Sequence, residues 1–136
     1  MVLTHRMLAG AILAVGLTLT GCSSDGDRPA PPAADSGAAL NSATAQSVVD
    51  AIVAADLAAP NAHDDTAQRC PKIGCLQAVT TDTVTVLKFP STGTALRHLG
   101  QLPDGYGIED FVVVFDPAVP AEQRTRYQRA ISGAVR

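Results

Sequence analysis

One uninterrupted run of β-forming residues, Phe111-Val112-Val113-Val114-Phe115, constrains the fold more than any other stretch of the chain. The run contains no polar residue, so neither face of an extended strand built from it would favour water. Such a run is typical of a central strand that is covered, at least partly, on both faces. The remaining sequence must therefore supply neighbouring strands and covering helices.

Periodicity and turn residues predict the elements around this strand. Apolar residues recur at helical spacing before Pro60, which predicts a first helix from Ser42 or Thr44 to about Ala59. Two Val- and Thr-rich segments separated by Thr81-Asp82-Thr83 predict a hairpin. Ser91 or Thr92 is a suitable N-cap for a further helix. The expected order is helix 42–59, strand 76–80, strand 84–89, helix 91–101, strand 111–115 and a last helix from Pro120.

This order predicts an α+β fold, with one small domain over residues 41–136 and a three-stranded sheet packed by helices on one side. The second sheet face is a candidate apolar patch for a protein partner or a second copy of the chain, unless the first helix covers it. The residues expected there are Val84, Val86, Val112 and Val114. The buried helix positions are expected to be Val48, Val49, Ile52, Val53 and Leu57, then Ala95, Leu96 and Leu99, then Tyr127, Ala130, Ile131, Ala134 and Val135.

The beginning of the chain has the features of a secretory signal. His5 and Arg6 precede an apolar stretch over residues 7–19, and Gly21 is the small residue before Cys22. The apolar stretch is shorter than the roughly 20 residues of a membrane-spanning helix. An uncleaved anchor and a secreted protein with an incidental Cys22 are the alternatives. Met7 is a second candidate start, although it would leave a signal without a cationic side chain.

The segment Leu19-Thr20-Gly21-Cys22 resembles the lipobox of bacterial lipoproteins at every position. With the tether and compact domain that follow, and with eight arginines against two lysines, the chain resembles small lipoproteins of actinobacteria. The resemblance implies that residues 1–21 are removed between Gly21 and Cys22. Cys22 would then carry a diacylglyceryl thioether, and its new amine a further acyl chain such as palmitate. Two or more acyl chains anchor a protein stably to a membrane.

The resemblance implies that the domain is held at the extracytoplasmic side of the cell membrane. In a cell with two membranes, it leaves open which of them retains the protein. Residues 22–40 have few large apolar side chains and several residues that break regular structure, which predicts a flexible tether. An exported domain meets an oxidising environment, so the remaining pair, Cys70 and Cys75, predicts a disulfide. The four intervening residues differ from the two of a redox-active pair.

Composition excludes some classes of function. A formal net charge of −3 argues against general nucleic-acid binding, and the absence of tryptophan argues against a broad stacking surface. No catalytic motif is recognisable, so we expect no enzyme and no cofactor. The leading hypothesis is a non-catalytic binding or interaction module. The alternatives are a carrier or sensor of a small apolar ligand, and an enzyme whose residues meet only in space.

Three further polar groups are candidate sites. His63, Asp64 and Asp65 precede the cysteines, but a disulfide would consume both sulfurs of a metal site, so we expect none. Ser91-Thr92-Gly93-Thr94 could bind an anion but favours a plain helix cap, and Ser91 with His98 suggests no catalytic pair. Basic residues of the last helix could contact anionic lipid headgroups or simply be solvated: Arg124, Arg126, Arg129 and Arg136.

Overall fold

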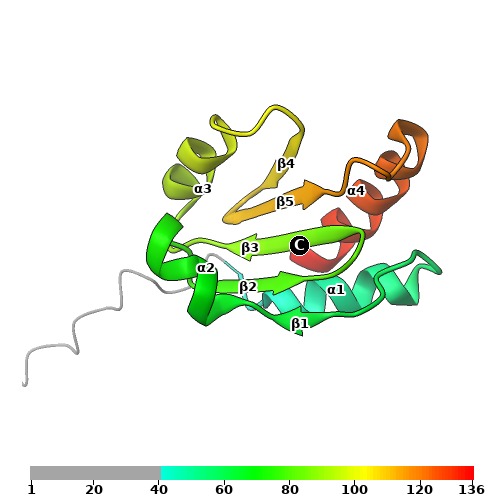
Figure 1. The fold of residues 1–136 in the computed structure, drawn as a ribbon, viewed down its shortest axis with the longest axis horizontal. Helices are drawn as coiled ribbons and strands as arrows, with labels where there is room; N and C mark the ends of the chain where they lie inside the picture. Colours follow the sequence, from blue (N-terminus) through cyan, green and yellow to red (C-terminus); the bar gives the residue numbers. More distant parts are fainter. Residues whose placement is uncertain (1–40) are drawn as a thin grey trace, which may run out of the picture.

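The computed structural model describes residues 41–136, which form a five-stranded antiparallel sheet with helices on both faces (Figure 1). The strand order is β1-β2-β3-β5-β4. The α+β class is confirmed, whereas the prediction of three strands is wrong. The elements are α1 (Ala45–Ala54), β1 (His63–Asp64), α2 (Thr66–Ile73), β2 (Gln77–Thr80), β3 (Val84–Lys88), α3 (Thr92–Leu99), β4 (Gly105–Ile108), β5 (Phe111–Phe115) and α4 (Ala121–Val135).

The first helix begins at a reciprocal cap. The Thr44 hydroxyl accepts from the Ser47 N–H at 3.0 Å, and the Ser47 hydroxyl accepts from the Thr44 N–H at 2.9 Å, which satisfies two backbone donors. The helix ends at Ala54 rather than near Ala59. Asp56 takes a left-handed conformation, with φ of 56°, and the chain turns so that Leu57 is buried. Val53, expected in the core, is exposed.

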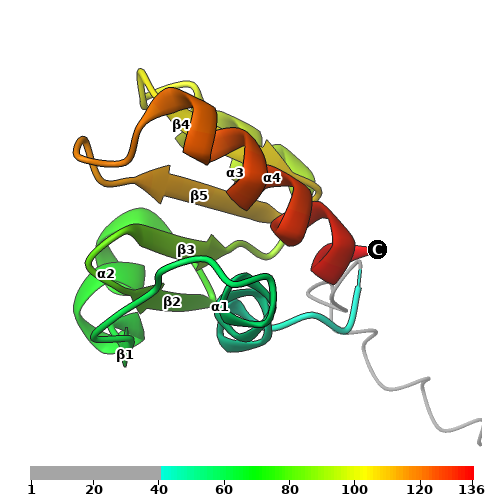
Figure 2. The same ribbon diagram turned by 90° about the vertical axis from the view of Figure 1, so that its right-hand side faces the viewer.

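The registers place the four valines expected on one sheet face on two different faces. Val86 lies opposite Val113, and Leu87 opposite Val112. Because paired residues point to the same side, Val84 and Val86 face α1 and α4, whereas Val112 and Val114 face α2 and α3. Figure 2 shows α1 and α4 together on one side of the sheet and α2 on the other. The prediction of helices on one side is therefore wrong, and of the four valines only Val114 is not fully buried.

Three elements were missed because their sequences lack a regular pattern. The strand β1 has only two residues, and α2 contains Pro71 within residues 60–75, where the sequence predicted no helix or strand. The strand β4 contains Gly105 and Gly107, which are poor strand formers. A Cβ atom at Gly107 would lie 2.6 Å from a methyl group of Leu99, so the glycines let α3 pack closely on this strand.

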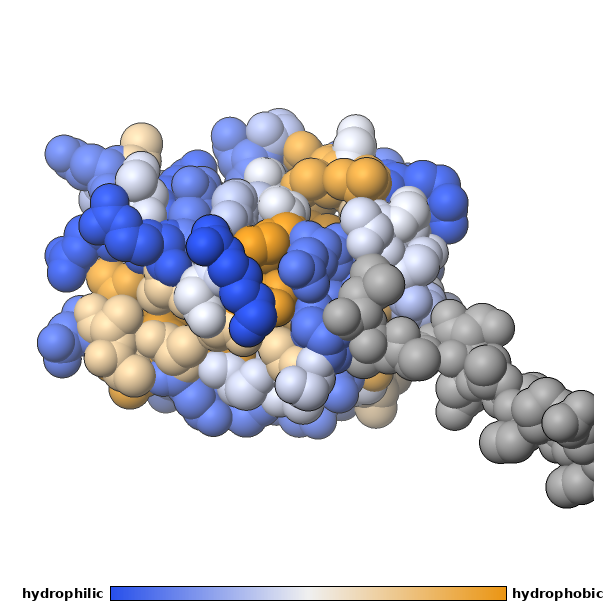
Figure 3. Space-filling view, turned by 180° about the vertical axis from the view of Figure 1, so that it is seen from behind, coloured by the Kyte–Doolittle hydropathy of each residue, from blue (hydrophilic) through white to orange (hydrophobic). Residues whose placement is uncertain are grey.

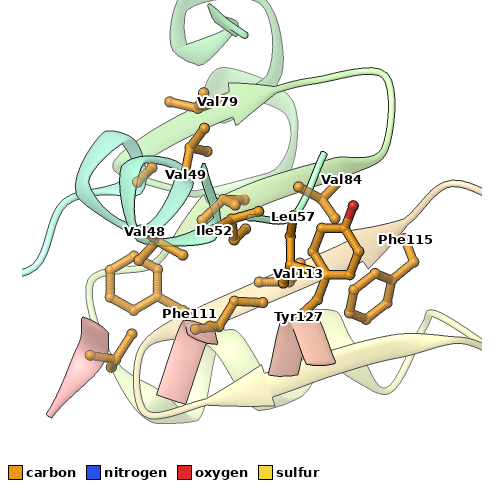
Figure 4. Close-up of a cluster of buried hydrophobic side chains, with 14 of the residues drawn as sticks. Val48, Val49, Ile52, Leu57, Val79, Val84, Phe111, Val113, Phe115 and Tyr127 are labelled. Carbon is orange, nitrogen blue, oxygen red and sulfur yellow. The ribbon is translucent and has the colours of Figure 1, made fainter. Parts of the chain in front are cut away.

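The main hydrophobic core lies between the sheet and the pair α1 and α4 (Figure 4). In α4, Tyr127, Ile131 and Val135 are buried as predicted, and the Tyr127 hydroxyl donates to the Ala58 carbonyl at 2.6 Å. A second cluster lies under α2 and α3 and includes Leu87, Phe89, Ala95 and Val112. Leu96, expected to be buried, is 58% exposed.

Seen from the side of α1 and α4, the surface shows strongly hydrophobic areas only between hydrophilic side chains (Figure 3). Within residues 41–136, no helix has the length and apolar character needed to cross a membrane. The predicted signal peptide, the lipobox with Gly21 and Cys22, and the tether lie outside the described residues.

Candidate functional site: the groove between α2 and α3

A groove of about 500 Å³ lies on the sheet between α2 and α3, and we take it as the candidate functional site. This volume lies within the range of roughly 300–1,000 Å³ typical of small-molecule sites. Its floor combines the apolar Leu87 and Val114 with the hydroxyls of Thr80 and Thr85, which lie 3.5 Å apart. The helices add Arg69 and Ile73 from α2 and His98 from α3, with Leu102 just beyond, and Asp116 and Pro117 lie at one end.

The disulfide holds the α2 wall of the groove. Cys70 and Cys75 are bonded with their Cα atoms 4.5 Å apart, and both are buried. Between them Gly74 ends the helix with φ of 77°, a conformation that glycine adopts without steric cost. The Gly74 N–H donates to the Cys70 carbonyl at 2.8 Å. The bond therefore closes the last turn of α2 onto the start of β2.

Two carboxylates organise the other end of α2. The Asp64 carboxylate accepts from the Thr66 N–H at 2.8 Å. Hydrogen bonds from the Thr66 side chain and N–H hold the pKa of Asp64 below its ordinary value. The Arg69 guanidinium pairs with Asp65, and the Thr80 hydroxyl donates to the same carboxylate oxygen at 3.1 Å. The pKa of Asp65 is lowered mainly by the hydrogen bond from Arg69. This network joins α2 to the groove floor.

These lowered pKa values predict that the start of α2 loses stability in acid. A carboxylate whose pKa is lower in the folded state contributes stability above its unfolded pKa of about 3.9, and this stability is lost as pH falls through the folded value. NMR titration of the side-chain carboxyl carbons should give midpoints below about 3.9 for Asp64 and Asp65. The Arg69→Met variant should raise the Asp65 midpoint and leave that of Asp64 nearly unchanged. An unshifted Asp65 midpoint in the wild-type chain would contradict the pairing.

The other polar groups singled out in the sequence are dispersed. Ser91 caps α3, its hydroxyl accepting from the Thr94 N–H at 3.2 Å. The His98 ring packs 5.2 Å from that of Phe89, and no hydrogen bond joins His98 to Ser91 in the described chain. His63 and Asp64 are exposed in β1. Among residues 41–136, no group of three or more His, Cys, Asp or Glu side chains is placed to hold a metal ion.

The arginines of α4 do not form one basic patch. The Arg124 Nε donates to the Val119 carbonyl at 3.0 Å, and its guanidinium lies 5.7 Å from the centre of the Phe115 ring. Arg126 lies beside Glu122 in a shallow hollow. Arg129 and Arg136 share a different hollow of about 410 Å³ with Tyr106 and Ser132. Of these four arginines, Arg129 and Arg136 are the two that line one hollow together.

The groove could not be predicted from the sequence, because no helix was expected between residues 60 and 75, where α2 forms one wall. The groove is lined by apolar side chains, by threonine hydroxyls and by charges of both signs, Arg69 and Asp116. These side chains can offer both apolar contacts and hydrogen bonds to a molecule that enters the groove. Residues 41–136 form a small α+β fold with an antiparallel sheet between two helix pairs. A scan against protein-family models matches no family, and searches of curated proteins and of solved structures give no match.

Proposed function

We propose that the chain is a lipid-anchored lipoprotein of the cell envelope whose domain is a non-catalytic binding module. The anchor would be the acylated Cys22, and the binding site would be the groove between α2 and α3. The support for the anchor is the lipobox sequence at residues 19–22, preceded by an apolar stretch. The support for binding is the groove itself, which is the observation that carries this part of the proposal.

The composition of the groove favours an amphipathic occupant. Leu87, Val114 and Ile73 offer apolar contact, so an aliphatic group would lose water there at roughly 25 cal/mol per Å² buried. Thr80 and Thr85 can hydrogen-bond a polar atom beside it. An exposed segment of a partner protein meets both demands. A small apolar ligand is the second candidate. The same apolar side chains favour it, whereas the hydroxyls of Thr80 and Thr85 favour an occupant that also has a polar atom.

Native mass spectrometry tests the binding proposal. A Cys22→Ser chain, free of lipid, is exported in a bacterium and purified without denaturation. We expect an added mass that disappears on denaturation. A small added mass would support a bound ligand. An added mass of the size of a protein would support a protein partner.

Two variants determine where the occupant binds. Val114→Glu places a charge on the groove floor and should abolish the added mass, whereas Val53→Glu, on the exposed side of α1, should leave it. A bare monomer in the wild-type chain, or an added mass that persists in Val114→Glu, would contradict binding in the groove.

A further inference from the structure

A buried charged pair connects the beginning of the domain to the sheet. Lys88, the last residue of β3, and Asp110, just before β5, are only 4% and 1% exposed. The Lys88 Nζ lies 3.7 Å from an Asp110 carboxylate oxygen and 5.0 Å from the centre of the Phe111 ring. Removing two charges from water is costly even when they are paired. A lysine amine and a carboxylate in such surroundings can also exchange a proton, which leaves a neutral nucleophile.

The side-chain amide of Asn41 lies against this pair. The Lys88 Nζ is 3.4 Å from the Asn41 Oδ1, and it also donates to the backbone carbonyls of Asn41 and Ala43. On its other side, the Asn41 Nδ2 donates to Asp110 at 2.9 Å and to Glu109 at 2.8 Å. The Asn41 Oδ1 also accepts from the Ala43 N–H at 3.0 Å. The amide is thus held between an amine, two carboxylates and a backbone donor.

We propose that Lys88 and Asn41 join in an intramolecular isopeptide bond. The proton of the Lys88 ammonium passes to the Asp110 carboxylate, and the neutral Nζ attacks the Asn41 Cγ. The negative charge that develops on Oδ1 is stabilised by the Ala43 N–H, as in an oxyanion hole. Asp110 then acts as general acid toward Nδ2, which it already contacts.

The reaction balances without any other reactant. The bond from Nζ to Cγ forms, the bond from Cγ to Nδ2 breaks, and Nδ2 leaves as an ammonium ion. This ion carries two of the three protons of the Lys88 ammonium, the first delivered by Asp110 and the second lost from Nζ as the amide forms. The product is a secondary amide between the two side chains, and the ammonium ion carries away the positive charge. No oxidation or reduction occurs. Asp110 ends as the carboxylate it was at the start, so it is catalytic in a single intramolecular turnover.

The bond would fix the point where residues 1–40 join the domain. It would link residue 41 to the inner strand β3 and close a covalent ring over residues 41–88. A cross-link of this kind restricts the unfolded chain, as a disulfide does. If the chain is anchored through Cys22, a pull on the tether would reach the sheet directly through Lys88. The cross-link itself does not depend on the anchor.

Peptide mapping tests the bond in the full-length chain. The protein is boiled in detergent, reduced and cut before aspartates, which releases residues 35–49 with Asn41 and residues 82–103 with Lys88. We expect one branched peptide whose mass is the sum of the two less about 17 Da, the mass of ammonia. Fragmentation should locate the branch at Asn41 and Lys88. Two separate peptides of unaltered mass would overturn the proposal.

A second source of ammonia loss is distinguished in the same map. Cyclisation of Asn41 onto its own backbone would give the same loss within peptide 35–49 alone, and this result would also overturn the proposal. Asn41→Ala removes the acceptor amide at a partly exposed position outside the helices and strands, and it should release both peptides separately. Asn61→Ala is the matched control, since Asn61 contacts Asp82 on the exposed surface and should leave the branched peptide intact. A branched peptide that persists in Asn41→Ala would contradict the assignment of the acceptor.

Discussion

The variant Asp110→Ala should lower the free energy of unfolding by about 3–5 kcal/mol, because it leaves the Lys88 ammonium buried without its counter-charge. The carboxylate also accepts from the Asn41 amide, and that partner is lost too. The decrease should be at least this large if Lys88 is linked to Asn41, since the bond then fails to form. Urea unfolding followed by circular dichroism measures it, as the chain has no tryptophan.

A double variant separates the cost of the lone charge from the loss of packing. Lys88→Met with Asp110→Leu replaces both ions by apolar side chains, and such replacements are often neutral or stabilising. We expect this variant to recover most of the stability lost in Asp110→Ala, apart from any contribution of the cross-link. If Asp110→Ala costs less than about 1 kcal/mol, a value typical of exposed ion pairs, Lys88 and Asp110 do not form a buried ion pair.

Truncation of Ile131 should also have a large effect. This side chain is fully buried between α4 and the sheet, so Ile131→Ala removes apolar contacts and leaves a cavity, at a cost of about 2–5 kcal/mol. Leu96→Ala is the matched control, because Leu96 lies on the exposed face of α3 and its loss should change stability by less than about 0.5 kcal/mol. Equal losses in the two variants would mean that α3 is packed as the sequence predicted, with Leu96 inside.

The sequence predicted the strands whose own residues carry a strong local pattern. It missed the strands that depend on contacts with residues distant in the chain. The run 111–115 predicted β5 correctly, and Val84 predicted the start of β3, because continuous β-formers carry a strong local signal. Gly105 and Gly107 carry the opposite signal, and their strand exists because β5 offers an edge and Leu99 fills the space above them. Strand β1 likewise depends on its pairing with β2.

Among the candidate sites, too, the sequence could predict the one whose residues are close in the chain and not those assembled from distant residues. The pair Cys70 and Cys75 could be predicted because the two residues are close in sequence. The groove could not, since its walls come from α2 and α3 and its floor from strands paired across the sheet. The contact between Asn41 and Lys88 spans 47 positions, and nothing in the sequence around Asn41 indicates it. A lone lysine within the apolar strand β3 was the one available signal.

Anchoring through Cys22 is the claim on which the cellular role depends, and one peptide mass tests it. The chain is extracted from bacterial membranes and cut before aspartates, so that residues 22–24 form the first peptide if the signal is removed at Cys22. We expect a peptide that begins at Cys22 and carries a diacylglyceryl group on sulfur. A chain that still begins at Met1 or Met7, or a peptide with an unmodified Cys22, would contradict it.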